Sequence, residues 1–252
     1  MRARFFPALS LDLGRLVLIV LWGCLIWSPA RAVEDTDTPG DKRWEINFGT
    51  SGARTMSGWA IAAPELDLNY GWGERVQLLA AAARITQAVH GEQRQSGLGA
   101  AIIGSKWRFL DQDTAGFSLA TFPQYSWNLD HDAELRGIVD PGSRFVLPLT
   151  AGYKVGDLGI YAEVSHTFAK EAPHESAYGV KLLHQCAAEI ECRLEVKRSR
   201  VPQESSQTLV SAGFKWNLSP SVLLRAGFGR EFGPRSEGQE NLQLQLGLQI
   251  LR

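Results

Sequence analysis

The sequence predicts an all-β protein, specifically a transmembrane up-and-down antiparallel β-barrel of about twelve strands. Three observations favour this fold class. From residue 43 onward, segments of about ten residues alternate apolar with polar or small side chains. Short turns alternate with longer polar loops along the chain, an asymmetry typical of outer-membrane barrels. An export signal precedes the first of these segments.

Residues 1–32 have the features of a secretory signal peptide. Arginines precede an uncharged apolar run over 16–27, and Ala30-Arg31-Ala32 matches the small-residue cleavage pattern. A membrane-anchoring helix is the less favoured alternative, because the run is much shorter than the ~20 residues needed to span a bilayer. We expect a mature chain that starts at Val33, with a short periplasmic segment over 33–42 and a barrel over 43–252.

The alternating segments read as strands because successive side chains of a strand point to opposite faces. In the final segment, aliphatic side chains at the even positions 242–250 alternate with glutamines and a glycine. We expect strands near 43–49, 62–72, 75–86, 97–109, 115–127, 143–153, 157–168, 175–185, 189–198, 206–216, 219–230 and 240–251. Tight turns are expected at Gly73-Glu74, Val155-Gly156 and Asn217-Leu218.

A soluble β-sandwich or lipocalin-like barrel also alternates, and it is the main alternative fold. Aromatic residues such as Trp44, Trp72 and Trp216 cluster near the expected strand ends, as in the girdles that flank the lipid-facing band of a membrane barrel. The mean hydropathy of −0.13 averages one apolar face with one polar face, so it does not exclude a membrane location. The chain ends on Arg252, whereas many such barrels end on an aromatic residue.

The net charge limits the kinds of partner that the chain can bind, and the cysteines raise the question of a disulfide. Removing residues 1–32 takes away four arginines and one aspartate, so the formal charge moves from −1 to −4 and a basic nucleic-acid binder is excluded. Cys186 and Cys192 remain after the removal and flank an expected turn at Ala188-Glu189. Exported proteins reach an oxidising compartment, so a disulfide and two free thiols are both open at this point.

Two stretches carry a family resemblance. The run Glu65-Leu66-Asp67-Leu68-Asn69-Tyr70-Gly71, with Arg75 and Leu78 after it, and the run from Gly99 to Phe109 resemble motifs of an outer-membrane transporter family. That family is labelled as phenol meta-pathway transporters (MetA-pathway of phenol degradation). The resemblance implies an outer-membrane barrel that transports small, often aromatic, organic compounds. In place of the family's Gly-Asp pair before the lysine-bearing strand, this chain has Gly97-Leu98-Gly99.

The expected inward faces carry mixed charges, which disfavours a strongly ion-selective pore. We therefore expect a narrow passive channel for small organic solutes, surrounded by outer-membrane lipid. The candidate pore-lining residues are Glu65, Asp67, Lys106, Arg108, Glu163, Lys181, Arg193 and Arg225. The alternative is a non-conducting structural or ligand-binding barrel that acts through external loops, above all the loop from Leu129 to Gly142, because side chains fill much of a barrel of this size.

No pattern indicates catalysis, a cofactor or a metal site. Ser165 and His166 are adjacent and so face opposite sides of a strand, which prevents them from forming a nucleophile–base pair. The loop triplet Asp130-His131-Asp132 has no evident fourth ligand, so we expect no metal there. We expect the protein not to be an enzyme.

Overall fold

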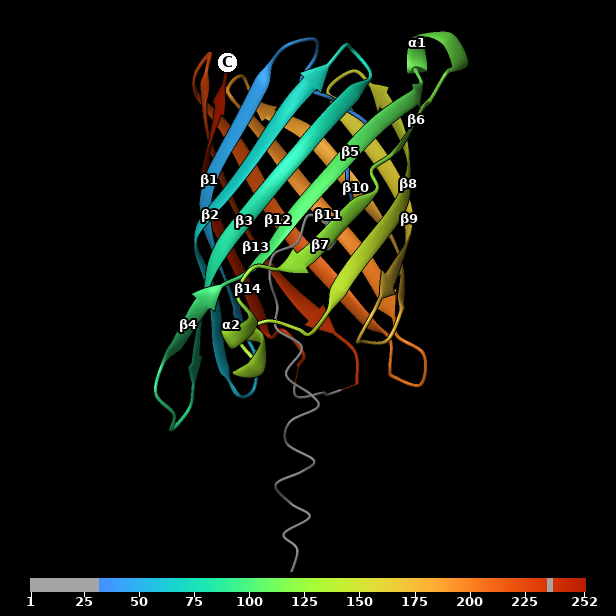
Figure 1. The fold of residues 1–252 in the computed structure, drawn as a ribbon. Coiled ribbons are helices and arrows are strands. Elements are labelled where there is room, and N and C mark those ends of the chain that lie inside the picture. Colours follow the sequence, from blue (N-terminus) through green and yellow to red (C-terminus); the bar gives the residue numbers. More distant parts are fainter. Residues whose placement is uncertain (1–31, 235–237) are drawn as a thin grey trace, which may run out of the picture.

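The alternating segments fold as antiparallel strands that close into a barrel (Figure 1). The computed structural model describes residues 32–234 and 238–252. The expected signal peptide lies almost wholly outside these described residues. The strands in chain order are β1 (Trp44–Arg54), β2 (Gly58–Trp72), β3 (Val76–Val89), β4 (Gln95–Leu98), β5 (Ala100–Leu110), β6 (Ser118–Thr121), β7 (Gln124–Asn128), β8 (Ser143–Val155), β9 (Leu158–Ala169), β10 (Glu175–Ala187), β11 (Ile190–Arg200), β12 (Gln207–Ser219), β13 (Val222–Phe232) and β14 (Leu242–Leu251).

These fourteen segments make the twelve strands of the closed barrel that the described residues form. β4 continues β5 along β3 after a break at Gly99, whose backbone N–H donates to the carbonyl oxygen of Ala83. β6 and β7 are two parts of one strand between β5 and β8, interrupted at Phe122-Pro123. The barrel closes where β1 pairs with β14 in an unbroken antiparallel register. The predicted fold class and strand number are therefore confirmed.

The burial pattern is inverted relative to a soluble protein. Along β14, Leu244, Leu246, Leu248 and Ile250 are exposed, while Gln249 faces the interior and is buried. The same alternation on β10 exposes Val180 and buries Lys181. A large apolar outer surface around a polar interior is the arrangement of a barrel surrounded by lipid. Among the described residues, no helix is long and apolar enough to cross a membrane.

The two ends of the barrel differ. The tight connections β2–β3, β8–β9, β10–β11 and β12–β13 lie at the end that holds the C-terminus, together with the short helix α1 (Gln112–Ala115) (Figure 1). The opposite end carries the longer connections and the short helix α2 (His131–Leu135). We call these the short-turn end and the long-loop end.

Several boundaries differ from the sequence prediction. β1 and β2 run on to a tight hairpin at Thr55–Ser57, because the small residues between Gly49 and Gly52 continue the strand without showing a hydropathy contrast. The β12–β13 turn lies at Pro220-Ser221 and not at Asn217-Leu218. Proline supplies the fixed φ of a turn and has no N–H for the ladder, so the strand continues up to it. The helices α1 and α2 were not predicted.

Candidate functional site

The candidate site is the barrel lumen, and its first feature is that the chain's own N-terminal segment lies in it. From the sequence, residues 33–42 are expected as a short periplasmic segment before the barrel. The structure instead places Val33 to Asp37 inside, where Val33 and Thr36 are buried against the wall. We call residues 33–37 the luminal segment. It connects to β1 through residues near Asp41, which accepts a hydrogen bond from Gly73 N–H at the short-turn end.

Lysines on the inward faces of β5 and β10 hold the acidic side chains of the luminal segment. Lys106 Nζ lies 3.3 Å from both Glu34 Oε2 and Asp35 Oδ1, and Lys181 Nζ lies 3.3 Å from Asp35 Oδ2. Lys106 also donates to the backbone carbonyl oxygen of Asp37 at 3.2 Å. The carboxylate of Asp35 thus bridges the ammonium groups of Lys106 on β5 and Lys181 on β10.

These charges control the ionisation of Asp35. Burial on its own raises the pKa of this carboxyl, but the ammonium groups of Lys181 and Lys106 outweigh burial and hold the pKa below its ordinary value. Asp35 is therefore charged at neutral pH, and its contacts with both lysines are charge-assisted hydrogen bonds. A buried ion pair of this kind fixes position well, because removing either partner leaves an uncompensated charge.

The tip of the luminal segment contacts β9 and β11. The backbone N–H of Val33 donates to Glu195 Oε1 at 2.9 Å, and that of Glu34 donates to Glu163 Oε2 at 2.9 Å. Glu163 also binds Lys197 Nζ at 3.0 Å. The wall carboxylates therefore accept hydrogen bonds from the segment's backbone, while the wall lysines bind its side chains.

Nearer the short-turn end, β5, β6 and β8 hold the other part of the segment. Lys154 Nζ pairs with Asp37 Oδ2 at 2.7 Å, and Arg108 donates to the carbonyl oxygen of Thr36 at 3.5 Å. Thr36 and Ser118 share a hydrogen bond of 2.8 Å between their hydroxyls. A Cβ atom on Gly152 would lie 2.9 Å from Thr36 Oγ1, so glycine is needed there for the segment to approach the wall.

A cavity of about 400 Å³ remains beside the luminal segment. Its carboxylates are those of Glu45, Glu65 and Asp67 on β1 and β2, those of the segment, and that of Glu191 on β11. Its cations include Arg193, Lys215 and Arg225 of β11, β12 and β13. The cavity is thus acidic on the β1–β2 side and mainly basic on the β11–β13 side, where Glu191 pairs with Lys215. Arg225 donates to Asn47 Oδ1 at 3.3 Å where the two sides meet.

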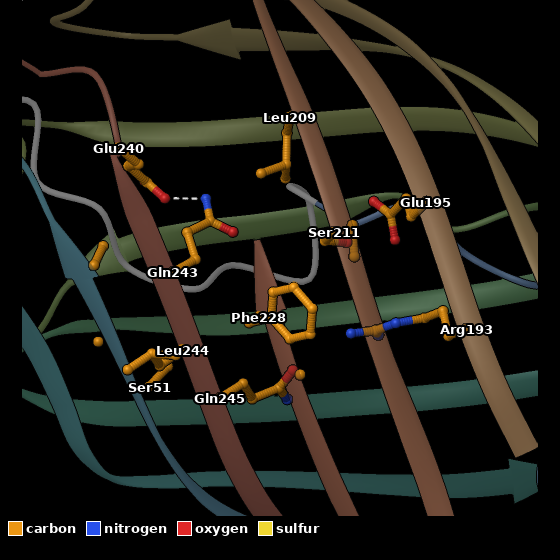
Figure 2. A pocket seen from close by; sticks show the side chains of 14 residues that line it. Ser51, Arg193, Glu195, Leu209, Ser211, Phe228, Glu240, Gln243, Leu244 and Gln245 are labelled. Atoms are coloured by element: carbon orange, nitrogen blue, oxygen red, sulfur yellow. Dashed lines mark hydrogen bonds between the residues drawn. The ribbon is translucent and has the colours of Figure 1, made fainter. Parts of the chain in front are cut away.

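A second, smaller cavity of about 50 Å³ lies near the tip of the segment (Figure 2). Arg193 and Glu195 extend into it from β11, and Ser211 and Gln243 line it from β12 and β14. Gln243 donates to Glu240 across this cavity. The buried Nε of Arg193 has no hydrogen-bond partner among the described residues. Space and polar groups thus continue past the segment toward the long-loop end.

The loop from Leu129 to Gly142 folds back against the barrel at the long-loop end. Ala133, Ile138 and Val139 are buried and pack with Ile85 and Ala62 of the inner wall. Asp130 caps α2 by accepting a hydrogen bond from Ala133 N–H at 3.1 Å. The loop that the sequence suggested as an external binding surface therefore packs part of its apolar side chains against the barrel at one mouth of the lumen, while Leu129 and Leu135 stay exposed.

The eight candidate pore-lining residues fall into two groups. Lys106, Arg108, Glu163 and Lys181 contact the luminal segment, whereas Glu65, Asp67, Arg193 and Arg225 line the larger cavity beside it. Sequence reasoning missed the partners on the segment itself, Glu34, Asp35 and Asp37. A usable signal was the acidic run over residues 34–37, six residues before the first strand, which matches the lysines expected on the inward faces.

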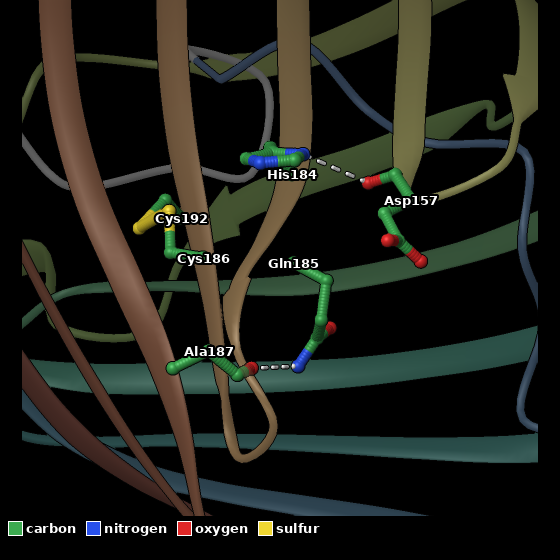
Figure 3. Close-up of a disulfide and its surroundings, with 6 residues drawn as sticks. All are labelled: Asp157, His184, Gln185, Cys186, Ala187 and Cys192. Atoms are coloured by element: carbon green, nitrogen blue, oxygen red, sulfur yellow. Dashed lines mark hydrogen bonds between the residues drawn. A yellow bond between two sulfur atoms is a disulfide. The ribbon is translucent and has the colours of Figure 1, made fainter.

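The other sequence candidates lie away from the lumen. Cys186 and Cys192 are joined by a disulfide across the β10–β11 hairpin at the short-turn end, near His184 and Gln185 (Figure 3). His166 shares a 2.9 Å hydrogen bond with Ser176 of the neighbouring strand, not with Ser165. Within residues 32–234 and 238–252, no group of three or more potential metal ligands comes together, and Asp130 serves as a helix cap.

Comparisons with known proteins show which proteins share the fold. A crystal structure of the COG4313 outer membrane channel from Pseudomonas putida F1 superposes with a TM-score of 0.65 at 12% identity, covering 86% of this chain and 98% of that chain. The NanC porin superposes with a TM-score of 0.55 at 6% identity, covering 82% and 98%. The KdgM porin in complex with disordered oligogalacturonate gives 0.53 at 9% identity, covering 82% and 98%.

No family model and no curated protein matches the sequence. At these identities the structural matches show a shared fold, that of outer-membrane β-barrels, and nothing beyond it.

Proposed function

We propose that this protein is a narrow passive channel of the bacterial outer membrane that admits small organic solutes. The observation that carries the proposal is the polar cavity of about 400 Å³ beside the luminal segment. Its volume lies within the ~300–1,000 Å³ of pockets that hold small molecules. Opposed acidic and basic walls suit small polar or zwitterionic solutes and disfavour strong ion selectivity.

The solute class rests on two further supports. Solved structures with this fold include an outer membrane channel and porins, one of them in complex with oligogalacturonate. The sequence resemblance to phenol meta-pathway transporters adds aromatic compounds to the expected solutes. We take small aromatic acids as the first compounds to test, and lipid of the outer membrane as the partner of the apolar outer surface.

Liposome swelling tests the proposal directly. The mature protein in liposomes is compared with a variant that lacks residues 33–37, using benzoate, glucose and a larger oligosaccharide as solutes. We expect slow but measurable uptake of benzoate and glucose by liposomes that hold the mature protein with residues 33–37 intact. We expect faster uptake by the deletion variant, because the luminal segment fills the cross-section beside the cavity.

The alternative function is a non-conducting structural or ligand-binding barrel, and the occupied lumen is the observation that favours it. Absence of swelling with both proteins, while gel mobility shows a folded barrel, would establish this alternative and overturn the channel proposal. Swelling by the deletion variant alone would mean that the luminal segment must leave its site before solutes pass.

A further inference from the structure

Glu195 differs from the other carboxylates at the contact between the luminal segment and the wall. Asp35 and Glu163 each face a lysine within 3.3 Å. Glu195 is 1% exposed, and in the described part of the chain no salt bridge includes it. Oε1 of Glu195 accepts a hydrogen bond from the backbone N–H of Val33 at 2.9 Å. The cations that act on Glu195, namely Arg193, Lys181 and Lys197, form no salt bridge with it, so its desolvation cost is only partly offset.

The position of Val33 opposite Glu195 is fixed from several sides. Val33 is 1% exposed, and a Cβ atom on Gly179 would lie 2.7 Å from its Cγ2 atom, so the wall is shaped around this side chain. Three residues further on, Thr36 is hydrogen-bonded to Ser118. A shift of the segment by one residue would break both contacts. The nitrogen of Val33 is therefore held at Glu195 by packing as well as by its own hydrogen bond.

Val33 is also the residue expected to follow the cleavage site. Hydrolysis of the Ala32–Val33 bond breaks one C–N bond and consumes one water molecule. The water oxygen forms the new carboxylate of Ala32, and the Val33 nitrogen takes up protons to become an α-ammonium group at neutral pH. The single amide donor that faces Glu195 would thereby become a positively charged group with three donors.

We propose that Glu195 is the binding site of the mature N-terminus, an ion pair that exists only after cleavage between Ala32 and Val33. Cleavage also removes the Ala32 carbonyl oxygen, which accepts a hydrogen bond from Lys197 Nζ at 3.2 Å in the uncleaved chain. Lys197 keeps its ion pair with Glu163. Processing therefore exchanges a neutral contact for a charged one and fastens the luminal segment at its tip. The inference depends on the expected cleavage and not on transport.

The reactivity of the α-amino group tests this ion pair. The processed protein, folded in detergent, is treated with formaldehyde and cyanoborohydride at neutral pH, and methylation of the N-terminal peptide is followed by mass spectrometry. Glu195→Gln should react about tenfold faster than the unmodified sequence, since amines react when deprotonated and the ion pair makes that form about tenfold rarer. Glu191→Gln is the matched control. It removes a carboxylate on the same strand that pairs with Lys215, and its labelling rate should stay unchanged.

A second variant keeps Glu195 in place. An alanine inserted between Ala32 and Val33 moves the new ammonium group about 3.5 Å along the chain, away from the carboxylate. It should be labelled as fast as Glu195→Gln, which keeps the test decisive if that substitution prevents folding. Equal rates in the unmodified and inserted proteins would overturn the proposal, as would a mature chain that begins at a residue other than Val33. Because no transport is measured, failure here leaves the channel proposal untouched.

Discussion

At the scale of single residues, the lumen is organised by long-range charge pairing between one short acidic segment and the wall. Lys106 is the central residue, because its ammonium group contacts two carboxylates and one carbonyl oxygen of the segment. It is 3% exposed, so water does little to screen these contacts. The luminal segment has no regular secondary structure of its own, and its position therefore depends on such side-chain contacts.

Replacing Lys106 should release the luminal segment. Lys106→Met keeps the length of the side chain but removes this counter-charge from Glu34 and Asp35. Breaking a fully buried ion pair costs about 3–5 kcal/mol, and the loss here should be smaller because both carboxylates are partly exposed. We expect a higher single-channel conductance and faster protease cleavage near the N-terminus. Lys170→Met is the control, since Lys170 is exposed in the connection between β9 and β10 and lies outside the cavity. Unchanged conductance and unchanged cleavage in Lys106→Met would show that the lysine does not hold the segment.

At the scale of structural elements, the strands were predictable and most of the elements that fill the barrel were not. The alternation at positions 242–250 gives both the strand and its inward face, because it repeats with the period of a strand. The helices α1 and α2 have four and five residues, too few to show a helical period. The register of β2 shifts between Ala62 and Glu65. Because of this shift, Ala62 and Glu65 both face the interior, whereas residues three positions apart in a regular strand face opposite sides.

The loop helix α2 offers a pH-dependent test at this scale. The hydrogen bond from Ala133 N–H holds the pKa of Asp130 below its ordinary value. A lowered folded-state pKa means that the stabilisation is complete above the ordinary aspartate pKa of about 3.9 and is lost as pH falls through the lowered value. We expect hydrogen-exchange protection of α2 to be constant from pH 7 to 5 and to fall on stronger acidification.

Asp130→Asn is the control for this pH effect, because asparagine keeps an acceptor oxygen at the helix cap but does not titrate. Its protection, corrected for the intrinsic exchange rate, should be flat over the same pH range. A parallel loss of protection in both proteins would assign the acid sensitivity of the loop to groups other than Asp130.

At the scale of the whole molecule, the sequence predicts the wall of the barrel better than its contents. Lipid outside and polar groups inside impose one simple rule on every strand, and that rule is visible in the order of residues. The contacts that fill the lumen join residues far apart in sequence, such as Lys181 with Asp35, and no local pattern records them. Half of the candidate pore-lining residues consequently contact the luminal segment, which the sequence analysis had placed outside the barrel.

The inverted architecture itself is testable with one pair of arginine substitutions on β14. Leu246 lies near the middle of the strand, pairs with Thr50 and Ala226, and is 52% exposed on the outer surface. An arginine on the lipid-facing side near the bilayer midplane costs about 2–4 kcal/mol. Leu246→Arg should therefore lower the free energy of unfolding from lipid vesicles by that amount, measured by urea titration with heat-modifiable gel mobility. Gln245→Arg, one residue away and facing the polar cavity, should cost much less. Equal losses for the two neighbours would contradict a lipid-facing outer surface, because only a difference in solvent between the two faces separates them.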